Sequence, residues 1–255
     1  MIYLLLFMWC RALAAQHPAN TAMGRAQCCP VTGQFFQTMD RTHMRVKYDK
    51  GKGAEIMNTK NNENLEWEEI STEHIVQDEW IDFRRSAYRF PDGSVFEPYY
   101  SYSRRDYVVI AASDEEGRYL CVRQYRQGIG EVTTEFPAGG IERSDGREYG
   151  SGNDPSVSED ALEAAKRELR EETGYVSDQW THLITVPSNA TLADNYAYVF
   201  MAENCRKSGE QNLDETEFLN VRKYTPDEIE DLIEQGSFQQ AVHVMTWLLA
   251  RRRKG

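Results

Sequence analysis

The stretch that decides the fold runs from Pro137 to Glu142 (PAGGIE) and resumes, after a polar segment, from Glu159 to Tyr175 (EDALEAAKRELREETGY). We expect the second part to be a helix on which Glu168, Glu171 and Glu172 project together, because they are spaced i, i+3 and i+4. Three like charges held together repel, so such a cluster either faces open water or has a counter-ion. Magnesium suits the second case, since it takes oxygen ligands from one or two carboxylates and from phosphates.

Another face of the same predicted helix is apolar. Leu162, Ala165 and Leu169 recur at i, i+3 and i+7, a spacing suited to packing against a sheet. Gly174 follows the last helical residues and is expected to end the helix, as a C-terminal glycine does. The sequence therefore predicts a helix with one buried apolar side and one acidic side.

The start of this helix can be placed in two ways. Asp154 followed by Pro155 offers a cap and a proline in the first turn. Ser156 with Glu159 offers a capping box instead. The two interpretations differ by two residues, and the sequence does not choose between them.

These residues resemble the second half of the Nudix box, written G-x5-E-x7-R-E-U-x-E-E-x-G-U with U apolar or aromatic. Gly139 lies too far from Glu159 to be the first glycine in place, and the polar segment between them (RSDGREYGSGNDPSVS) is interpreted as a loop insertion. A solvated helix face, with pairs such as Glu163 and Arg167, would be the usual origin of an isolated R-E-x-x-E-E string. Here PAGG precedes eight agreeing positions, namely Glu159, Arg167, Glu168, Leu169, Glu171, Glu172, Gly174 and Tyr175.

The resemblance covers roughly residues 65–250 and is closest to the ADP-ribose pyrophosphatase branch of the family. Outside the box it depends on the sheet before the box, on VRQYR (Val122–Arg126), on EFPAGG and on LDETEF (Leu213–Phe218). It implies hydrolysis of the pyrophosphate bond of a nucleoside diphosphate sugar, first of all ADP-ribose to AMP and ribose 5-phosphate. It also implies an α+β fold, a Nudix-type α/β/α sandwich with a mixed sheet and a small N-terminal antiparallel sheet.

By the same resemblance, Glu168 and Glu172 would hold Mg²⁺, or Mn²⁺ in its place. Glu171 would contribute directly or through water, and the Ala138 carbonyl would complete the shell. Divalent cations neutralise the charge of a pyrophosphate, activate water and stabilise the leaving phosphate. Arg167 would orient the carboxylates by ion pairing rather than contact the substrate.

Further residues of the predicted site lie outside the acidic helix. Glu215, in LDETEF, is preferred to Glu217 as the group that assists the attacking water. Arg126 is expected to contact a phosphate or the terminal ribose, and Glu135 is assigned to substrate binding with it. The alternative for Glu215, Glu217 and Arg126 is that each is an ordinary surface side chain. Supporting positions are Glu159, as a metal ligand or a plain cap, Gly139 and Gly174.

The sugar of the substrate is left open. The loop PSNATLADN (Pro187–Asn195) lacks the glycine-rich, acidic form of many ADP-ribose hydrolases, so another nucleoside diphosphate sugar is an alternative. Trp67 or Trp80 is a candidate to stack on adenine, although either equally suits the core. The alternative hypothesis, from another functional class, is a catalytically silent Nudix-like regulator that binds a nucleotide. Such a protein should have lost box carboxylates, which this chain retains.

Composition narrows the class of protein. The 255 residues can form one large or two small domains. The net charge of −12 argues against a general nucleic-acid binder, which would carry a basic face. It does not exclude an anionic substrate, because a bound metal reverses the local sign. The five cysteines show neither a disulfide framework nor zinc spacing, which favours free thiols in a reducing compartment, the cytoplasm.

The expected domain organisation has three parts. Residues 1–56 are interpreted as a disordered extension, and one hypothesis is that the native protein starts at Met57 and lacks them. The apolar run MIYLLLFMW is shorter than the roughly 20 residues needed to span a bilayer, and no Lys or Arg precedes it as in a secretory signal. We expect an N-terminal β-sheet region at 57–105 and the Nudix domain at 106–255, without membrane contact. By resemblance alone, we expect a homodimer whose N-terminal strands help complete the partner's site.

Hydrophobic alternation and turn signals predict the remaining elements. Residues 67–103 alternate around Pro91-Asp92-Gly93 and predict a small antiparallel sheet. The other expected elements are a hairpin of strands 107–112 and 119–124, a strand in 133–140 that ends in a Pro/Gly turn, two strands within 182–204, an edge strand before Tyr224, a helix from Thr225-Pro226 to Gly236, and a last amphipathic helix over 238–253.

Overall fold

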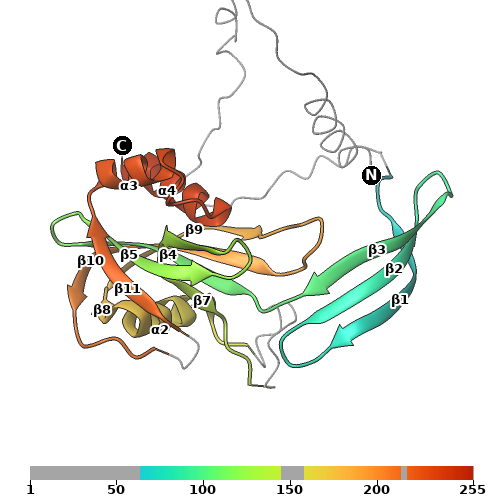
Figure 1. Ribbon diagram of the computed structural model, residues 1–255, viewed down its shortest axis with the longest axis horizontal. Coiled ribbons are helices and arrows are strands. Elements are labelled where there is room, and N and C mark those ends of the chain that lie inside the picture. The colour runs from blue at the N-terminus through green and yellow to red at the C-terminus, as the bar shows by residue number, and fades with distance from the viewer. Residues whose placement is uncertain (1–63, 145–157, 214–216, 255) are drawn as a thin grey trace, which may run out of the picture. The chain divides into compact units, whose positions relative to one another are not determined.

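The computed structural model describes residues 64–144, 158–213 and 217–254, and all of them belong to one compact unit, Asn61–Gly255. The chain first forms a three-stranded antiparallel sheet in the order β1-β2-β3 (Figure 1). Its strands are β1 (Glu68–Gln77), β2 (Asp82–Arg89) and β3 (Val95–Ser103). The small N-terminal antiparallel sheet is therefore confirmed, and the predicted Pro-Asp-Gly turn joins its last two strands. The predicted extension, 1–56, lies outside the described residues.

A second sheet of eight strands carries the rest of the fold. Its main path is β11-β5-β4-β10-β8, with β6 paired to β5, β7 to β4 and β9 to β10. Strands β4 and β10 are parallel whereas their other neighbours are antiparallel, so the predicted mixed sheet is confirmed. The strands are β4 (Tyr107–Asp114), β5 (Tyr119–Arg126), β6 (Glu131–Glu135), β7 (Ala138–Gly140), β8 (Tyr175–Val176), β9 (Gln179–Pro187), β10 (Tyr196–Lys207) and β11 (Leu219–Tyr224).

Strand β4 explains why this sheet lies between two helical layers. Its sequence is almost continuously apolar, as expected for a strand that is buried on both faces. Val108 and Ile110 pack with α2 (Ala161–Thr173) on one face. Val109 packs on the other face with α3 (Pro226–Glu234) and α4 (Ala241–Lys254). Figure 1 shows α2 on one side of the sheet and α3 and α4 on the opposite side, which confirms the α/β/α arrangement.

Helix α2 has the predicted faces but a different start. Ala165 and Leu169 are fully buried, and Leu162 packs against the same core. The cap is Asp160, whose side chain accepts hydrogen bonds from two amides of the first turn, 2.9 and 3.2 Å away. Both predicted starts were therefore wrong, and Asp154, Pro155 and Ser156 lie outside the described residues. Gly174 ends the helix with a φ of 72°, as predicted.

Two further boundaries differ from expectation. The Pro/Gly turn predicted at the end of residues 133–140 is instead strand β7, since Ala138 and Gly139 pair with β4. The last helix begins at Ala241 rather than at Phe238, because Phe238 is fully buried and its N–H donates to the Leu232 carbonyl, 3.1 Å away. The short connection between α3 and α4 thus holds Phe238 in the core.

The other element predictions are confirmed. Strands β4 and β5 occupy the expected hairpin, β9 and β10 are the expected pair, and β11 lies at the edge of the sheet. Helix α3 is capped by Thr225 and has Pro226 as its first residue. Among the helices within the described ranges, none is both long enough and apolar enough to cross a lipid bilayer.

Candidate active site

Helix α2 brings two of the three predicted carboxylates into the interior. Glu168 and Glu172 are one turn apart and only 6% and 2% exposed. The third, Glu171, is less buried, and its Oε2 accepts a hydrogen bond from Arg167 at 3.0 Å. The helical spacing thus places all three on one side, but Glu168 and Glu172 form the buried part of the acidic face.

Strand β7 lies directly against these two carboxylates. The Ala138 N–H donates a hydrogen bond to Oε2 of Glu172 over 3.0 Å. A Cβ added at Gly139 would meet the carboxyl group of Glu168 at 2.1 Å, a distance that no side chain can tolerate. The glycine is therefore required for the close approach of β7 to the acidic helix. Both residues come from PAGG, which the sequence singled out.

Arg167 connects the acidic residues to one another. Its guanidinium lies 2.8 Å from Glu168, 3.0 Å from Glu171 and 3.0 Å from Glu159. It also donates to the Gly140 carbonyl at 2.9 Å, which ties the helix to β7. This geometry supports the predicted orienting role and assigns Glu159 to the ion-pair network, since Asp160 provides the cap.

The alternative of a simple solvated helix face was illustrated by a pair between Glu163 and Arg167. Glu163 instead pairs with Lys166, at 2.7 Å, on the exposed part of the helix. The side chain of Arg167 is only 18% exposed. Burial opposes its charge, but hydrogen bonds and charges from the surrounding glutamates, Glu159 foremost, raise the pKa of Arg167. The arginine is a permanent cation at the centre of the acidic cluster.

Burial disfavours the charged forms of the two interior glutamates, and the positive charge of Arg167 does not offset this effect. Burial raises the pKa of Glu168 to about 7, although the charge of Arg167 acts in the opposite direction. Burial, followed by the neighbouring charge of Glu168, raises the pKa of Glu172 well above its usual range. Two glutamates with raised pKa values side by side are typical of a functional site. A cation between them would favour their charged forms.

A fourth carboxylate belongs to this group. The negative charge of Glu217 also raises the pKa of both Glu168 and Glu172, so Glu217 lies near them. The sequence pointed to LDETEF but favoured Glu215, which lies outside the described residues. The position of Glu217 near the helix depends on the tertiary conformation of the loop, and no local sequence pattern predicts it.

Arg126 and Glu135 form an ion pair beside the acidic helix. Nε of Arg126 donates to Oε1 of Glu135 at 2.9 Å, and a second guanidinium nitrogen donates to Oε2. Glu135 is fully buried, and burial alone would raise its pKa, but the hydrogen bond and charge of Arg126 lower the pKa of Glu135 to about 2. Burial alone would lower the pKa of Arg126, but the hydrogen bond and charge of Glu135, and then the charge of Glu172, raise it, which places this guanidinium close to the carboxylates.

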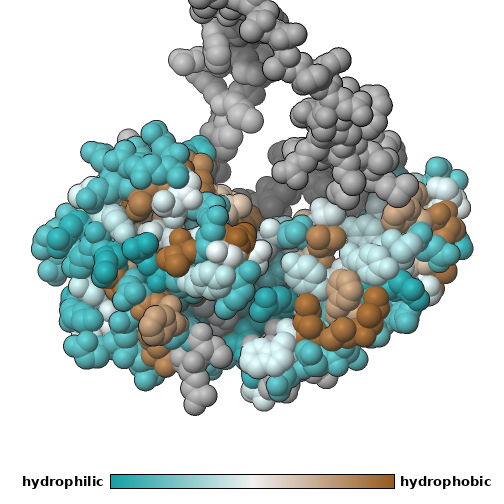
Figure 2. Space-filling model, in the orientation of Figure 1, coloured by the Kyte–Doolittle hydropathy of each residue, from teal (hydrophilic) through white to brown (hydrophobic). Residues whose placement is uncertain are grey.

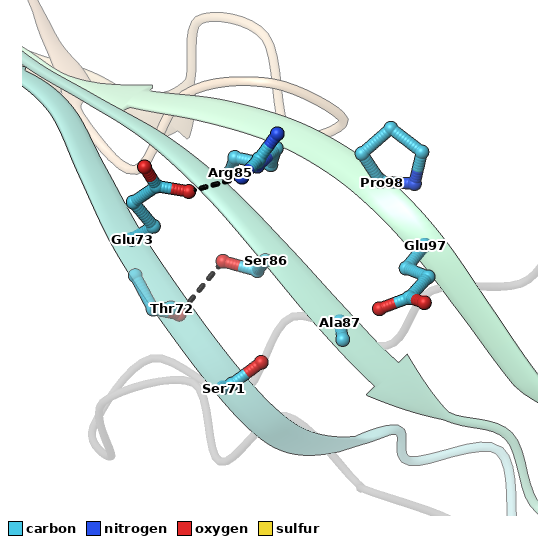
Figure 3. A pocket seen from close by; sticks show the side chains of 8 residues that line it. All are labelled: Ser71, Thr72, Glu73, Arg85, Ser86, Ala87, Glu97 and Pro98. Carbon is cyan, nitrogen blue, oxygen red and sulfur yellow. Dashed lines mark hydrogen bonds and ion pairs between the residues drawn. The ribbon is translucent and has the colours of Figure 1, made fainter.

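Within the described ranges, one pocket of about 370 Å³ is lined by Glu159 and Arg167 of the box, and two others involve the N-terminal sheet. One, of about 480 Å³, is on the N-terminal sheet, where Thr72 and Ser86 share a hydrogen bond and Glu73 pairs with Arg85 (Figure 3). A second, of about 320 Å³, is lined by Trp67 and by the loop around Leu192. Trp80 is 58% exposed and belongs to neither lining. Trp67 is thus the better placed of the two predicted base-stacking residues.

The loop Pro187–Asn195 has a structural role that its sequence did not reveal. Its Leu192 carbonyl accepts a hydrogen bond from the Tyr102 amide of β3 at 2.8 Å. The hydroxyl of Tyr99 donates to the Thr191 carbonyl, and Arg84 pairs with Asp194 at 3.3 Å. The loop therefore joins the N-terminal sheet to the main sheet and forms one wall of the Trp67 pocket.

The donor atoms of the site suit a hard divalent cation. Within the described ranges, no three acidic, cysteine or histidine side chains are gathered as a ready-made metal site. Glu168 and Glu172 nevertheless offer carboxylate oxygens. Their pKa values are raised, so a bound cation would stabilise their charged forms. The contact between Glu168 and Gly139 excludes side-chain bulk at the same point. These features fit Mg²⁺ or Mn²⁺, which prefer oxygen ligands.

A NUDIX domain family model matches residues 103–247, more than half of the chain. The chain therefore belongs to the Nudix family of hydrolases, as the box and the fold indicate. It is 29% identical over 178 residues to a protein of Bacillus subtilis named ADP-ribose pyrophosphatase. That match covers 67% of this chain and 85% of the relative.

Two other comparisons extend this picture. The chain is 29% identical over 166 residues to a protein of Bacillus methanolicus named methanol dehydrogenase activator, with 62% of this chain and 78% of that protein covered. A solved structure described as an ADP compounds hydrolase superimposes with a TM-score of 0.62 at 21% identity. The match covers 74% of this chain and 95% of the chain of that structure. The structural likeness supports the fold.

Proposed function

We propose that this chain hydrolyses the pyrophosphate bond of a nucleoside diphosphate sugar, with ADP-ribose as the first candidate and AMP and ribose 5-phosphate as products. The observation that carries the proposal is the pair of buried carboxylates, Glu168 and Glu172, against the glycine of β7. The Bacillus subtilis relative named ADP-ribose pyrophosphatase supports the choice of substrate. An intact acidic cluster with raised pKa values supports turnover rather than mere binding.

The proposed cofactor is Mg²⁺, with Mn²⁺ as a substitute. Glu168 and Glu172 would hold it, with Glu171, Glu217 and the Ala138 carbonyl as further donors. Such a cation supplies charge neutralisation of the pyrophosphate and of the leaving phosphate, and it activates water. Arg167 keeps the carboxylates in place through its pairs with Glu168 and Glu171.

Two further residues act on the substrate in this proposal. Arg126 contacts a phosphate or the terminal ribose. Glu135 holds the Arg126 guanidinium in position through two hydrogen bonds. A glutamate of the loop LDETEF takes the proton from the attacking water. Glu215 is the proposed base, and Glu217, whose charge is felt by the box carboxylates, is assigned to the metal side.

We also propose that the enzyme is a homodimer assembled through the N-terminal sheet. Large apolar side chains lie on the surface of its strands, and a contiguous patch of this kind is typical of an interaction surface. Figure 2 shows apolar residues gathered over this part of the molecule. The lining of the Trp67 pocket contains no box residue, which supports a base site completed by another subunit. The exposed large apolar residues on the strands of the N-terminal sheet are Ile70, Ile75, Val76, Val95, Phe96 and Tyr100.

The experiment is incubation of the full-length protein with ADP-ribose, and in parallel with a panel of other nucleoside diphosphate sugars, in magnesium. Chromatography of the products decides between the substrates. Formation of AMP and ribose 5-phosphate, lost on chelation and restored by added magnesium, is the expected result. Nucleotide binding without turnover of any compound would contradict the proposal and would favour the regulatory alternative, which the relative named methanol dehydrogenase activator also suggests.

A further inference from the structure

The first turn of helix α4 contacts the link between β6 and β7 through one buried histidine. His243 is 3% exposed, and its Nδ1 accepts a hydrogen bond from the Phe136 amide at 3.1 Å. This bond connects residues 107 positions apart in the sequence. Phe136 directly follows Glu135 and precedes Pro137 and Ala138, so the contact falls between the Arg126–Glu135 ion pair and the strand that touches the box carboxylates.

The hydrogen bond from Phe136 fixes the protonation of the imidazole. A nitrogen that accepts an N–H donor carries no proton, so in neutral His243 the proton is on Nε2. Nε2 lies 3.9 Å from Oε2 of Glu135, too far for a direct hydrogen bond but close enough for its N–H dipole to favour the carboxylate. Burial lowers the pKa of His243 to about 4, so the ring is neutral under ordinary conditions.

Glu135 is therefore held from two sides. Arg126 and the hydroxyl of Thr133 donate to its carboxylate from the sheet. The side chain of Gln240 bonds to it from the beginning of α4, and the Nε2 side of His243 faces it one turn further along. The hydrogen bonds from Arg126, Thr133 and Gln240 and the nearby dipole of His243 restrict where the carboxylate can lie, and the carboxylate in turn fixes the guanidinium of Arg126 beside Glu172.

We propose that His243 is a positioning residue for the hydrolytic site: by presenting its Nε2 proton to Glu135, it holds the Glu135–Arg126 pair in the geometry that aims Arg126 at the diphosphate. The inference rests on the proposed function for its effect on turnover. It assigns helix α4, which contributes no residue to the box, a part in the orientation of substrate. Preorganisation of this kind is effective because small displacements of a phosphate-binding group slow the reaction strongly.

Turnover in a double-mutant cycle tests the inference. His243→Leu removes both ring nitrogens at similar volume and should lower kcat/KM by about 10-fold or more, whereas His243→Gln, which keeps an N–H donor, should lose less. In an Arg126→Gln background, the same His243→Leu change should cost less than about 3-fold, because both substitutions disable the same guanidinium. Equal losses in the two backgrounds, or full activity of His243→Leu, would overturn the inference.

Thr246→Val provides the matched control on the same helix. Thr246 is also fully buried, but its hydroxyl donates to the Val242 carbonyl within α4, at 2.7 Å. This variant should lose thermal stability and keep kcat/KM. A loss of kcat/KM as large as that of His243→Leu would show that any damage to α4 slows the enzyme, and the inference would fail.

A second readout needs no substrate. The Nε–H of Arg126 donates to Glu135, so its NMR signal should exchange slowly with solvent in the wild type and in Thr246→Val. It should exchange at least about 10-fold faster in His243→Leu if that residue holds the pair. Unchanged exchange would contradict the inference. A wild type that hydrolyses no compound of the panel would contradict the proposed function alone, because the exchange measurement still decides on His243.

Discussion

At the scale of single residues, the site depends on the missing side chain of Gly139. A Cβ there would lie 2.1 Å from the Glu168 carboxyl group, which is the flexible end of a side chain rather than backbone. Gly139→Ala should therefore displace Glu168 and leave the fold largely intact. We expect kcat/KM to fall by about 100-fold, with a small change in Tm by thermal denaturation.

Gly209→Ala is the matched control for this substitution. Gly209 is exposed, and a Cβ added to it would meet nothing within 4 Å. Its activity and Tm should equal those of the wild type. If Gly139→Ala kept full activity as well, the close approach of β7 to Glu168 would have no catalytic importance.

Glu172 should show opposite effects on stability and on activity. Burial raises its pKa well above the usual range, so its ionisation at neutral and alkaline pH costs folding free energy. Glu172→Gln keeps an acceptor for the Ala138 N–H and removes the charge, so the metal-free variant should be more stable than the metal-free wild type, by a difference that grows as the pH rises. Turnover with magnesium should fall by at least about 100-fold. Calorimetry with and without magnesium, beside the activity assay, measures both effects, and a variant as active as the wild type would refute the metal assignment.

At the scale of elements, the true start of α2 can be tested through its cap. The Asp160 side chain accepts from the Leu162 and Glu163 amides, so Asp160→Ala should destabilise the protein by about 1 kcal/mol in urea unfolding. Glu163→Ala, which removes only an exposed pair with Lys166, should change the free energy of unfolding by less than about 0.5 kcal/mol. Equal stabilities for the two variants would contradict the assigned cap.

Helix α4 should make the stability of the protein depend on pH. The unfolded chain protonates His243 near its ordinary pKa of 6.5, but the folded protein protonates it only near 4, because burial disfavours the charged ring. The unfolded state binds more protons in this window, so stability is present above pH 6.5 and is lost as the pH falls towards 4. The loss is on the order of 3 kcal/mol for this group. Urea unfolding across this range should show a flatter profile for His243→Leu than for the wild type.

Some helices and strands could be predicted from the sequence, and others could not. The spacing of Glu168, Glu171 and Glu172 sufficed to predict a shared helix face, because helical geometry is local. Strand β7 was mistaken for a turn because its pairing with β4 joins residues far apart in the chain. The start of α2 was misplaced because Pro155 and Ser156 are good local signals, whereas the ion pair of Glu159 with Arg167 is a tertiary one.

At the scale of the whole molecule, the sequence indicated the layers but not the contacts that unite them. The resemblance to the Nudix family implied the α/β/α layers, and the nearly continuous apolar residues of β4 agree with burial on both faces. The link from His243 to Phe136, and the attachment of the Leu192 loop to β3, have no signature in composition or periodicity. Such contacts depend on the three-dimensional path of the chain, as does the choice between Glu215 and Glu217.

The proposed dimer gives a prediction at this scale. Light scattering on the full-length protein should report twice the mass of one chain. Phe96→Asp, which places a charge in the exposed apolar part of the N-terminal sheet, should shift the protein towards monomer and reduce activity. Leu248→Asp makes the same kind of change at an exposed position of α4 and should leave the mass unchanged. A monomeric wild type with full activity would contradict the dimer.

The central claim is that the buried carboxylates of α2 perform metal-dependent hydrolysis of a nucleoside diphosphate sugar. The most direct measurement is the rate of AMP formation from ADP-ribose, by the wild type and by Glu172→Gln, as magnesium is titrated from a chelated start. The account predicts a rate for the wild type that rises from zero and saturates with magnesium, and almost none for the variant. A magnesium-independent rate, or equal rates for the two proteins, would contradict it.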